Sequence, residues 1–264
     1  MSALFRHQHK PVIGVVHLRP LPGSPKWDGD LETVIDRALS DAKAYAHGGV
    51  DAVIIENFGD APFTKANVAP ETIAAMAVAG AAVRAAIRIP IGFNVLRNDP
   101  RAALALCAAC GGSFVRVNVH TGAMITDQGV IEGDAYNTIR YRKRVCPDAL
   151  LFADIHVKHA VPIGNFAIED SARDTLERGL ADALIISGTG TGVAADIGDV
   201  ERARRACPRA RILLGSGVTA ENAREFLQFA DGIIVGTSLK VGGRLHNPVD
   251  PKRVSTLTRI VHVR

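Results

Sequence analysis

The sequence is poor in aromatic residues, which make up 5% of its 264 positions, and its formal net charge is only +4. A nucleic-acid-binding surface would need basic residues clustered among aromatics, whereas the arginines here are scattered along the chain. No stretch of 18 residues is uninterruptedly apolar, and residues 1–10 lack the apolar segment of a signal peptide. We therefore expect a cytoplasmic protein with no membrane span and no nucleic-acid partner.

Cysteine is also scarce, with four residues in the chain. Cys107 and Cys110 form a Cys-x-x-Cys pair within the helix-like run AALALCAAC, without a second pair or histidines at metal-ligand spacing. We interpret both as small core residues of a helix. Cys146 and Cys207 each precede a proline and are interpreted as turn residues. This usage fits a reducing cytoplasm.

Two nucleotide-binding motifs are missing from the sequence. The chain has no glycine followed at the required spacing by Gly-Lys-Ser/Thr, which argues against a P-loop nucleotide hydrolase. It also has no Gly-x-Gly-x-x-Gly after its first strand-like run, which argues against an open, doubly wound sheet.

The chain does contain eight short, β-rich apolar runs that alternate with amphipathic, helix-like stretches. The runs are VIGVVHL (12–18), AVIIENF (52–58), IPIGFNV (89–95), FVRVNVH (114–120), LLFADIHVK (150–158), ALIISG (183–188), RILLGSG (211–217) and GIIVGTS (232–238). Apolar strands that are each followed by a helix indicate a parallel sheet covered on both faces. Eight such units in about 250 residues are typical of a TIM barrel. We predict an α/β fold, a single (β/α)8 barrel over residues 1–264 with residues 1–10 as an N-terminal tail.

Polar side chains gather where the first five strand-like runs end. In a parallel barrel these ends open on one face, where active sites are built. Asp154, His156 and Lys158 occupy every second position of their run, so in a strand they would point to the same side. Burying such groups without partners costs several kcal/mol. We therefore expect them to face the mouth of the barrel.

These residues suggest several roles between which the sequence does not choose. We predict Lys158, Asp154, His156, Glu56 and His17 as catalytic residues and Asn57, Asn94, Arg116, Asn118 and His120 as substrate-binding residues. Lys158 could form a Schiff base or only hold charge, and Glu56 or Asp154 could move a proton with a histidine as partner. A divalent metal, held by His17, Glu56, His120, Asp154 and His156, is left open, and no cofactor follows with certainty.

Glycines and hydroxyl residues follow the last three strand-like runs. Glycine lets backbone amides approach an anion closely, and hydroxyls add donors. Barrels commonly hold a phosphate group with the loops after strands seven and eight and a short extra helix, which residues 237–240 could begin. We predict a small phosphorylated ligand bound by Gly188, Thr189, Gly190, Gly215, Ser216, Gly217, Gly236, Thr237 and Ser238.

Residues 121–135, TGAMITDQGVIEGDA, form an unusually long connection after a strand-like run. Long connections on this face of a barrel often serve function, so the segment could be a lid over the ligand. A small β-hairpin with a purely structural role is the alternative.

Several stretches together resemble the BtpA/SgcQ family over nearly the whole chain. They are VIGVVHLRPLPGSP (12–25), IENFGDAPF (55–63), MITDQGVIEG (124–133), ADIHVKHA (153–160), ISGTGTG and LGSGVTAEN. The resemblance implies a (β/α)8 barrel of the phosphate-binding kind. Members of the family have been linked to photosystem I in cyanobacteria, and others occur among sugar-phosphate genes. The resemblance assigns no catalytic residue.

Two functions are compatible with these features. The first is an enzyme acting on a small phosphorylated metabolite, such as a sugar phosphate, as an isomerase, an epimerase or an aldolase-type lyase. The second is a non-catalytic assembly or regulatory factor, with the barrel as a scaffold for a partner such as a photosystem subunit. The ionisable groups near residue 154 favour the enzyme, whereas the fold itself favours neither. Barrels often pair through their helices, so a homo-oligomer is left open.

Overall fold

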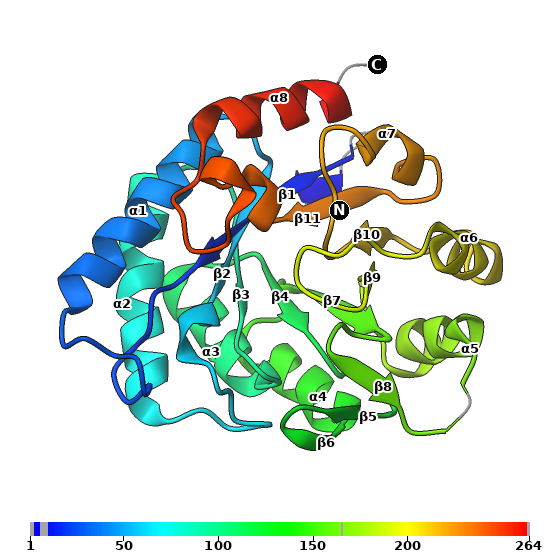
Figure 1. The fold of residues 1–264 in the computed structure, drawn as a ribbon. Helices are drawn as coiled ribbons and strands as arrows, with labels where there is room; N and C mark the ends of the chain where they lie inside the picture. Colours follow the sequence, from blue (N-terminus) through cyan, green and yellow to red (C-terminus); the bar gives the residue numbers. More distant parts are fainter. Residues whose placement is uncertain (1–2, 6–9, 165, 263–264) are drawn as a thin grey trace.

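A computed structural model describes residues 3–5, 10–164 and 166–262 (Figure 1). Eight parallel strands close into a barrel in the order β1-β11-β10-β9-β7-β4-β3-β2. Their bounds are β1 Val12–His17, β2 Ala52–Glu56, β3 Ile91–Asn94, β4 Phe114–Val117, β7 Leu150–Ile155, β9 Ala183–Ile186, β10 Ile212–Leu214 and β11 Gly232–Val235. Each predicted strand run contains one of these strands, and the predicted (β/α)8 barrel is confirmed.

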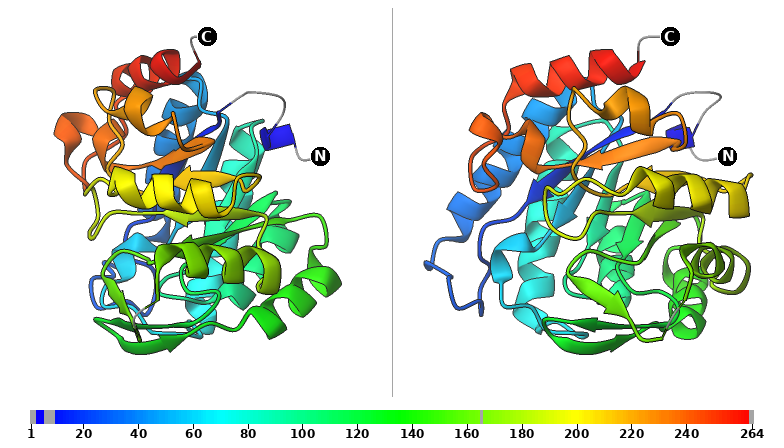
Figure 2. Two further views of the ribbon diagram at one scale, coloured as in Figure 1. Left: turned by 90° about the vertical axis from the view of Figure 1, so that its right-hand side faces the viewer. Right: turned by 45° about the vertical axis from the view of Figure 1, so that its right-hand side comes forward.

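Helices alternate with the strands and lie around the outside of the barrel (Figure 2). They are α1 Leu31–His47, α2 Pro70–Ala86, α3 Pro100–Cys110, α4 Ala135–Val145, α5 Ile168–Arg173, α6 Ile197–Ala206, α7 Ala223–Phe226 and α8 Pro251–His262, with a π-helical turn, η3 Asp174–Arg178, after α5. Short 3-10 turns are η1 Ala3–Phe5, η2 Phe58–Asp60, η4 Thr237–Leu239 and η5 Val241–Gly243. Aspartates start several helices. For example, the Asp30 carboxylate accepts the Thr33 amide at α1, and Asp99 accepts that of Ala102 at α3.

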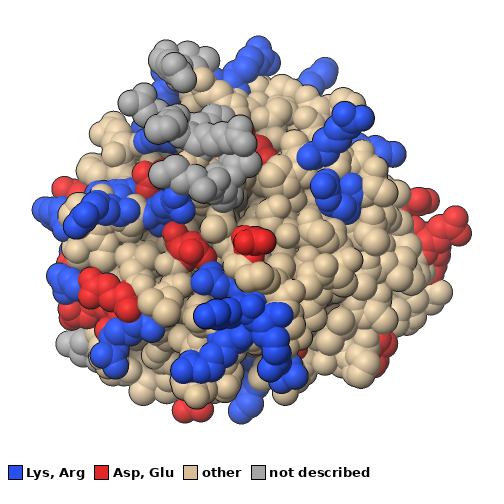
Figure 3. Space-filling model, turned by 180° about the vertical axis from the view of Figure 1, so that it is seen from behind, with Lys and Arg blue, Asp and Glu red and all other residues tan. Residues whose placement is uncertain are grey.

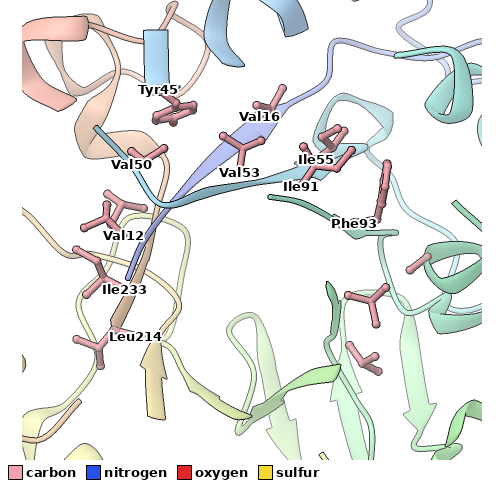
Figure 4. Close-up of a cluster of buried hydrophobic side chains, with 14 of the residues drawn as sticks. Val12, Val16, Tyr45, Val50, Val53, Ile55, Ile91, Phe93, Leu214 and Ile233 are labelled. Atoms are coloured by element: carbon pink, nitrogen blue, oxygen red, sulfur yellow. The ribbon is translucent and has the colours of Figure 1, made fainter. Parts of the chain in front are cut away.

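Two apolar layers hold the barrel together. The outer layer packs the strands against the helices, and part of it is drawn in Figure 4, where Val16, Tyr45 and Phe93 are among the labelled side chains. The inner layer fills the barrel with residues that include Phe114 and Phe152, whose rings stack with centroids 5.0 Å apart. Because this interior is filled with apolar side chains, polar groups are confined to the carboxyl ends of the strands.

The strand period of two decides which polar residues reach that end. The inner layer contains Ile13 on β1, Ile54 on β2, Phe114 on β4 and Phe152 on β7. Alternate residues of a strand point the same way, so the inward row continues on these four strands into side chains of the predicted site. These are His17, Glu56, Arg116 and Asp154. Parallel pairing also sets His17 beside Glu56, and Glu56 beside Asn94.

A second, antiparallel sheet lies beside the carboxyl ends of β4 and β7. It consists of β6 Gly129–Glu132, β5 Ala123–Thr126 and β8 Ala160–Pro162, in that order. Strands β5 and β6 form a hairpin within residues 121–135. Met124 and Ile131 are buried under the sheet against Val119 and Val157. The contribution of β8 was not predicted.

The surface carries both signs of charge. On the face seen in Figure 3, Lys and Arg side chains lie among Asp and Glu, with one gathering of basic side chains near the lower centre. Of the helices in the described part of the chain, none combines the length and apolar character needed to cross a bilayer.

Candidate functional site

Arg116 occupies the centre of the barrel mouth and is 2% exposed. Its Nε and Nη2 atoms each donate to a different oxygen of Asp154 at 2.8 Å, and its Nη1 lies 3.5 Å from Glu56 Oε1. Burial alone would lower the pKa of the guanidinium, but Asp154 and then Glu56 outweigh that effect and raise it. Arg116 is therefore a fixed positive charge held in a bidentate pair with Asp154.

Glu56 and His17 each present an unsatisfied atom beside this charge. Glu56 Oε1 and His17 Nδ1 are buried, and neither forms a hydrogen bond with a described residue. His17 Nε2 lies 3.9 Å from Glu56 Oε2. Burial, followed by the positive charges of Lys240 and Lys158, holds the His17 pKa well below its usual value. Buried polar atoms without a hydrogen bond are rare except where a ligand or water completes them.

Lys158 enters the mouth from the loop that follows β7. Burial, followed by the nearby Arg116, lowers the pKa of its amine to about 8, although Glu56 and Asp154 act in the opposite direction. The amine makes no ion pair with a carboxylate in the described ranges. Arg97 Nη2 donates to the Lys158 carbonyl oxygen and thereby holds this part of the loop.

Asn94 and Asn118 complete the wall between β3 and β4. Asn94 Nδ2 donates to Asn118 Oδ1 at 2.8 Å, and Asn118 Nδ2 lies 3.5 Å from Asp154 Oδ2. Asn57, by contrast, is used within the protein. Its Oδ1 accepts the Leu96 amide at 2.7 Å and its Nδ2 donates to Asp60 at 3.1 Å, so it fixes the loops after β2 and β3.

The structure does not bring two of the predicted histidines into this group. Strand β7 ends at Ile155, and His156 adopts a left-handed backbone with φ of 50°, so the alternation expected through residue 158 does not hold. His156 Nε2 instead lies 3.1 Å from the Ser171 hydroxyl on α5. His120 Nε2 lies 2.7 Å from the Gly179 carbonyl oxygen. Within the described ranges, no three His, Cys, Asp or Glu side chains are grouped to hold a metal.

Two cavities open on either side of the central charges. One, of about 290 Å³, is lined by the ends of β10 and β11 and the loop after β9, and by His17. The other, of about 280 Å³, is lined by residues that follow β2, β3 and β4, including Phe58, Phe63 and Arg97. Both share Glu56, Arg116, Lys158 and Thr191 as lining residues. We call them the glycine-loop cavity and the aromatic cavity.

The glycine-loop cavity contains most, but not all, of the predicted phosphate-binding residues. Those that line it are Gly215, Ser216, Gly217, Gly236, Thr237 and Ser238, together with Thr191, Gly192, Val218, Thr219 and Arg253, which were not predicted. Gly188, Thr189 and Gly190 do not line it. The Gly188 amide instead donates a hydrogen bond to Ser216 Oγ at 3.0 Å, and the Thr189 carbonyl oxygen accepts one from the His159 amide.

Gly217 shows why glycine is required in this wall. Its φ is +68°, and a Cβ atom there would lie 2.1 Å from the Ala194 backbone nitrogen. The loop after β10 therefore packs directly against the loop after β9. Among the hydrogen bonds of the described residues, the Gly217 and Val218 amides have no acceptor.

Comparison with known proteins identifies the family. The BtpA family model matches residues 8–263. The chain belongs to the BtpA family. It is 47% identical over 247 residues to the photosystem I biogenesis protein BtpA of Synechocystis, which covers 94% of this chain and 86% of that protein. It is 38% identical over 256 residues to the sgc region protein SgcQ of Escherichia coli, covering 96% and 94% of the two chains.

Solved structures similar to this BtpA-family chain agree on the fold. Tryptophan synthase of Mycobacterium tuberculosis has a TM-score of 0.64 at 16% identity, covering 97% of this chain and 94% of that chain. N-(5'-phosphoribosyl)anthranilate isomerase of Pyrococcus furiosus has a TM-score of 0.58 at 13% identity, covering 96% and 98%. At such low identity the likeness supports the barrel alone.

Proposed function

We propose that this chain is an enzyme that moves a proton on a small phosphorylated carbonyl compound. The observation that carries the proposal is the position of Glu56, Arg116 and Lys158, which line both cavities of the barrel mouth. Groups that can accept a proton, donate a proton and stabilise a developing charge thus lie together, in the wall that the two cavities share. Isomerisation, epimerisation and aldol cleavage are the reaction types that such a set can perform.

The glycine-loop cavity is the proposed phosphate site. The free Gly217 and Val218 amides, the Thr237 hydroxyl and the Arg253 guanidinium are the donors that support it. Arg253 Nη1 also donates to the Ser238 carbonyl oxygen at 3.2 Å, which places α8 against the loop after β11. Backbone amides beside a cation are well suited to a phosphate group.

The reacting groups are assigned by their partners within the protein. Asp154 is engaged by Arg116, so we assign it a positioning role. Glu56 Oε1 accepts no hydrogen bond from a described residue, although Arg116 Nη1 lies 3.5 Å away, and the carboxylate can take a proton from carbon. Lys158 is partly neutral near pH 8 and can return the proton or condense with a carbonyl group as a Schiff base. The charge of Arg116 stabilises the anion that forms between these steps.

A thermal-shift screen with inorganic phosphate, sugar phosphates and their unphosphorylated counterparts tests the phosphate site. A ligand at a hundred times its Kd adds about 2.7 kcal/mol, which raises the Tm of a chain of this size by roughly 2–4 °C. Arg253→Met is expected to remove most of the shift, whereas Arg259→Met, on the same helix but outside the cavity, is expected to retain it. Absence of any shift that depends on the phosphate group would refute the site.

A second function is favoured by the exposed face of the antiparallel sheet. Val130, Ile125 and Val161 pair across its three strands and are 45%, 53% and 64% exposed. An apolar patch of this kind is typical of an interaction site, and the Synechocystis relative is named for photosystem I biogenesis. If no phosphorylated compound binds, a non-catalytic assembly role is the better hypothesis, and an Ile125→Lys/Val161→Lys variant should then lose its partner.

A further inference from the structure

The aromatic cavity lies outside the proposed phosphate site, yet it shares Glu56, Arg116 and Lys158 with it. Its walls come from residues after β2, β3 and β4, on the opposite half of the barrel from the glycine-rich loops. Asp127, in the turn between β5 and β6, and His159 close its outer side. A small sugar phosphate held in the glycine-loop cavity would leave this second space of about 280 Å³ unfilled.

Arg97 provides the strongest indication of what fills the space. Its side chain lines the cavity although the residue is only 4% exposed. The hydrogen bond described for the guanidinium runs from Nη2 to the Lys158 carbonyl oxygen. Asp154 and Asp127 act on this charge electrostatically, but no carboxylate of the described residues lies within ion-pair distance of it. A guanidinium has five N–H donors, and a buried cation is costly unless it is paired. An anionic group of a ligand would supply the missing partner.

Aromatic and aliphatic side chains determine the shape of the group that carries this anion. The rings of Phe58 and Phe63 lie edge to face with centroids 6.3 Å apart, and Leu96 adds a third apolar surface. Asn94 and Asn118 contribute amide groups on the barrel side. The three apolar side chains can contact the faces of a flat ring, while polar and charged side chains form the rest of the lining.

We propose that the aromatic cavity binds a flat, apolar carboxylate that forms the second end of the phosphorylated substrate. Arg97 pairs with the carboxylate, and Phe58 and Phe63 contact the ring. This inference rests on the proposed function for the position of the phosphate group. It narrows the substrate to a phosphate ester attached to an aromatic or similarly flat carboxylate, with the reacting bond beside Glu56 and Lys158.

Fragment binding to the full-length chain tests the inference without knowledge of the substrate. Benzoate, benzyl alcohol and inorganic phosphate serve as probes in ligand-observed NMR titrations. We expect wild type to bind benzoate more tightly than benzyl alcohol. Arg97→Met should weaken the binding of benzoate by about tenfold or more, because a charge-assisted pair is lost. The affinity for inorganic phosphate should not change. Arg101→Met, an exposed arginine outside this cavity, is the matched control.

A second variant keeps the test decisive if Arg97→Met does not fold. Phe63→Ala removes a half-buried ring from the cavity wall. It should therefore weaken the binding of benzoate several-fold and leave phosphate binding intact. Failure of wild type to bind benzoate, or equal binding of benzoate and benzyl alcohol, would overturn the inference. Phosphate binding without benzoate binding would refute this inference alone. Benzoate binding without phosphate binding would refute the proposed phosphate site, and with it the phosphate-ester part of this inference, but would retain the carboxylate site.

Discussion

Lys240 and Asp41 form a buried ion pair that links η4 to α1, with Nζ 3.1 Å from Oδ2 and both side chains 1% exposed. Asp41 also accepts the Val249 amide at 2.8 Å and pairs with Arg37 at 3.1 Å. Lys240 directly follows the residues of η4 that line the glycine-loop cavity. The pair therefore anchors one wall of the proposed phosphate site to the outer helices.

Lys240→Met is expected to destabilise the protein strongly. It would leave the buried Asp41 carboxylate without its closest fully buried cation, and breaking a buried pair typically costs about 3–5 kcal/mol. Arg37→Met removes the other, more exposed partner of the same carboxylate and should cost about 1 kcal/mol or less. Urea denaturation measures the free energy of unfolding of both variants. Equal losses of this free energy would contradict the assignment of Lys240 as the principal partner of Asp41.

Lys158→Met is expected to stabilise the fold while it abolishes turnover. The pKa of Lys158 is lowered to about 8 in the folded chain, so below pH 8 folding carries the cost of holding a buried ammonium. Between pH 8 and about 10.4 the unfolded chain binds more protons than the folded one, so wild-type stability rises with pH. The variant should thus be more stable near pH 7, by at most about 3 kcal/mol, and the difference should shrink towards pH 10.

The free energy of unfolding of both proteins, measured from pH 6 to pH 10, checks this expectation. Lys143→Met, at an exposed position on α4, is the control and should show no such pH dependence. A gap between wild type and Lys158→Met that stays constant over this range would show that the amine is not perturbed by burial.

Gly217→Ala is expected to damage both the fold and the proposed phosphate site. A left-handed backbone costs a non-glycine residue about 1–2 kcal/mol, and the close approach to the Ala194 backbone adds about 1–3 kcal/mol. Gly129→Ala is a matched control, because Gly129 has φ of +94° and no atom within 4 Å of the added Cβ. In thermal denaturation the Tm of Gly217→Ala should be well below that of Gly129→Ala. Similar Tm values would contradict the close packing of the two loops.

His156→Asn is expected to leave ligand binding unchanged. His156 contacts Ser171 on α5, and asparagine tolerates the left-handed backbone at this position. Loss of the single hydrogen bond should cost about 1 kcal/mol. Calorimetric titration with inorganic phosphate should give the Kd of wild type, and a large loss of affinity would show that His156 acts in the site after all.

The sequence by itself determined the barrel and the inward row of polar residues. Eight apolar runs separated by helices have few other ways to bury both faces of a sheet. Because strand side chains alternate, the positions of His17, Glu56, Arg116 and Asp154 relative to the barrel interior follow from their spacing to the apolar residues before them. That part of the site is local, and local periodicity encodes it.

The tertiary structure alone decided what lies beyond the strand ends. His156 departs from the alternation because β7 stops one residue earlier and the backbone turns. Arg97 and Arg253 reach the cavities from a loop and from the last helix, and no sequence period relates them to the strands. Which cation pairs with which carboxylate depends on distances across the barrel, and closure of the sheet, rather than any segment of the chain, sets those distances.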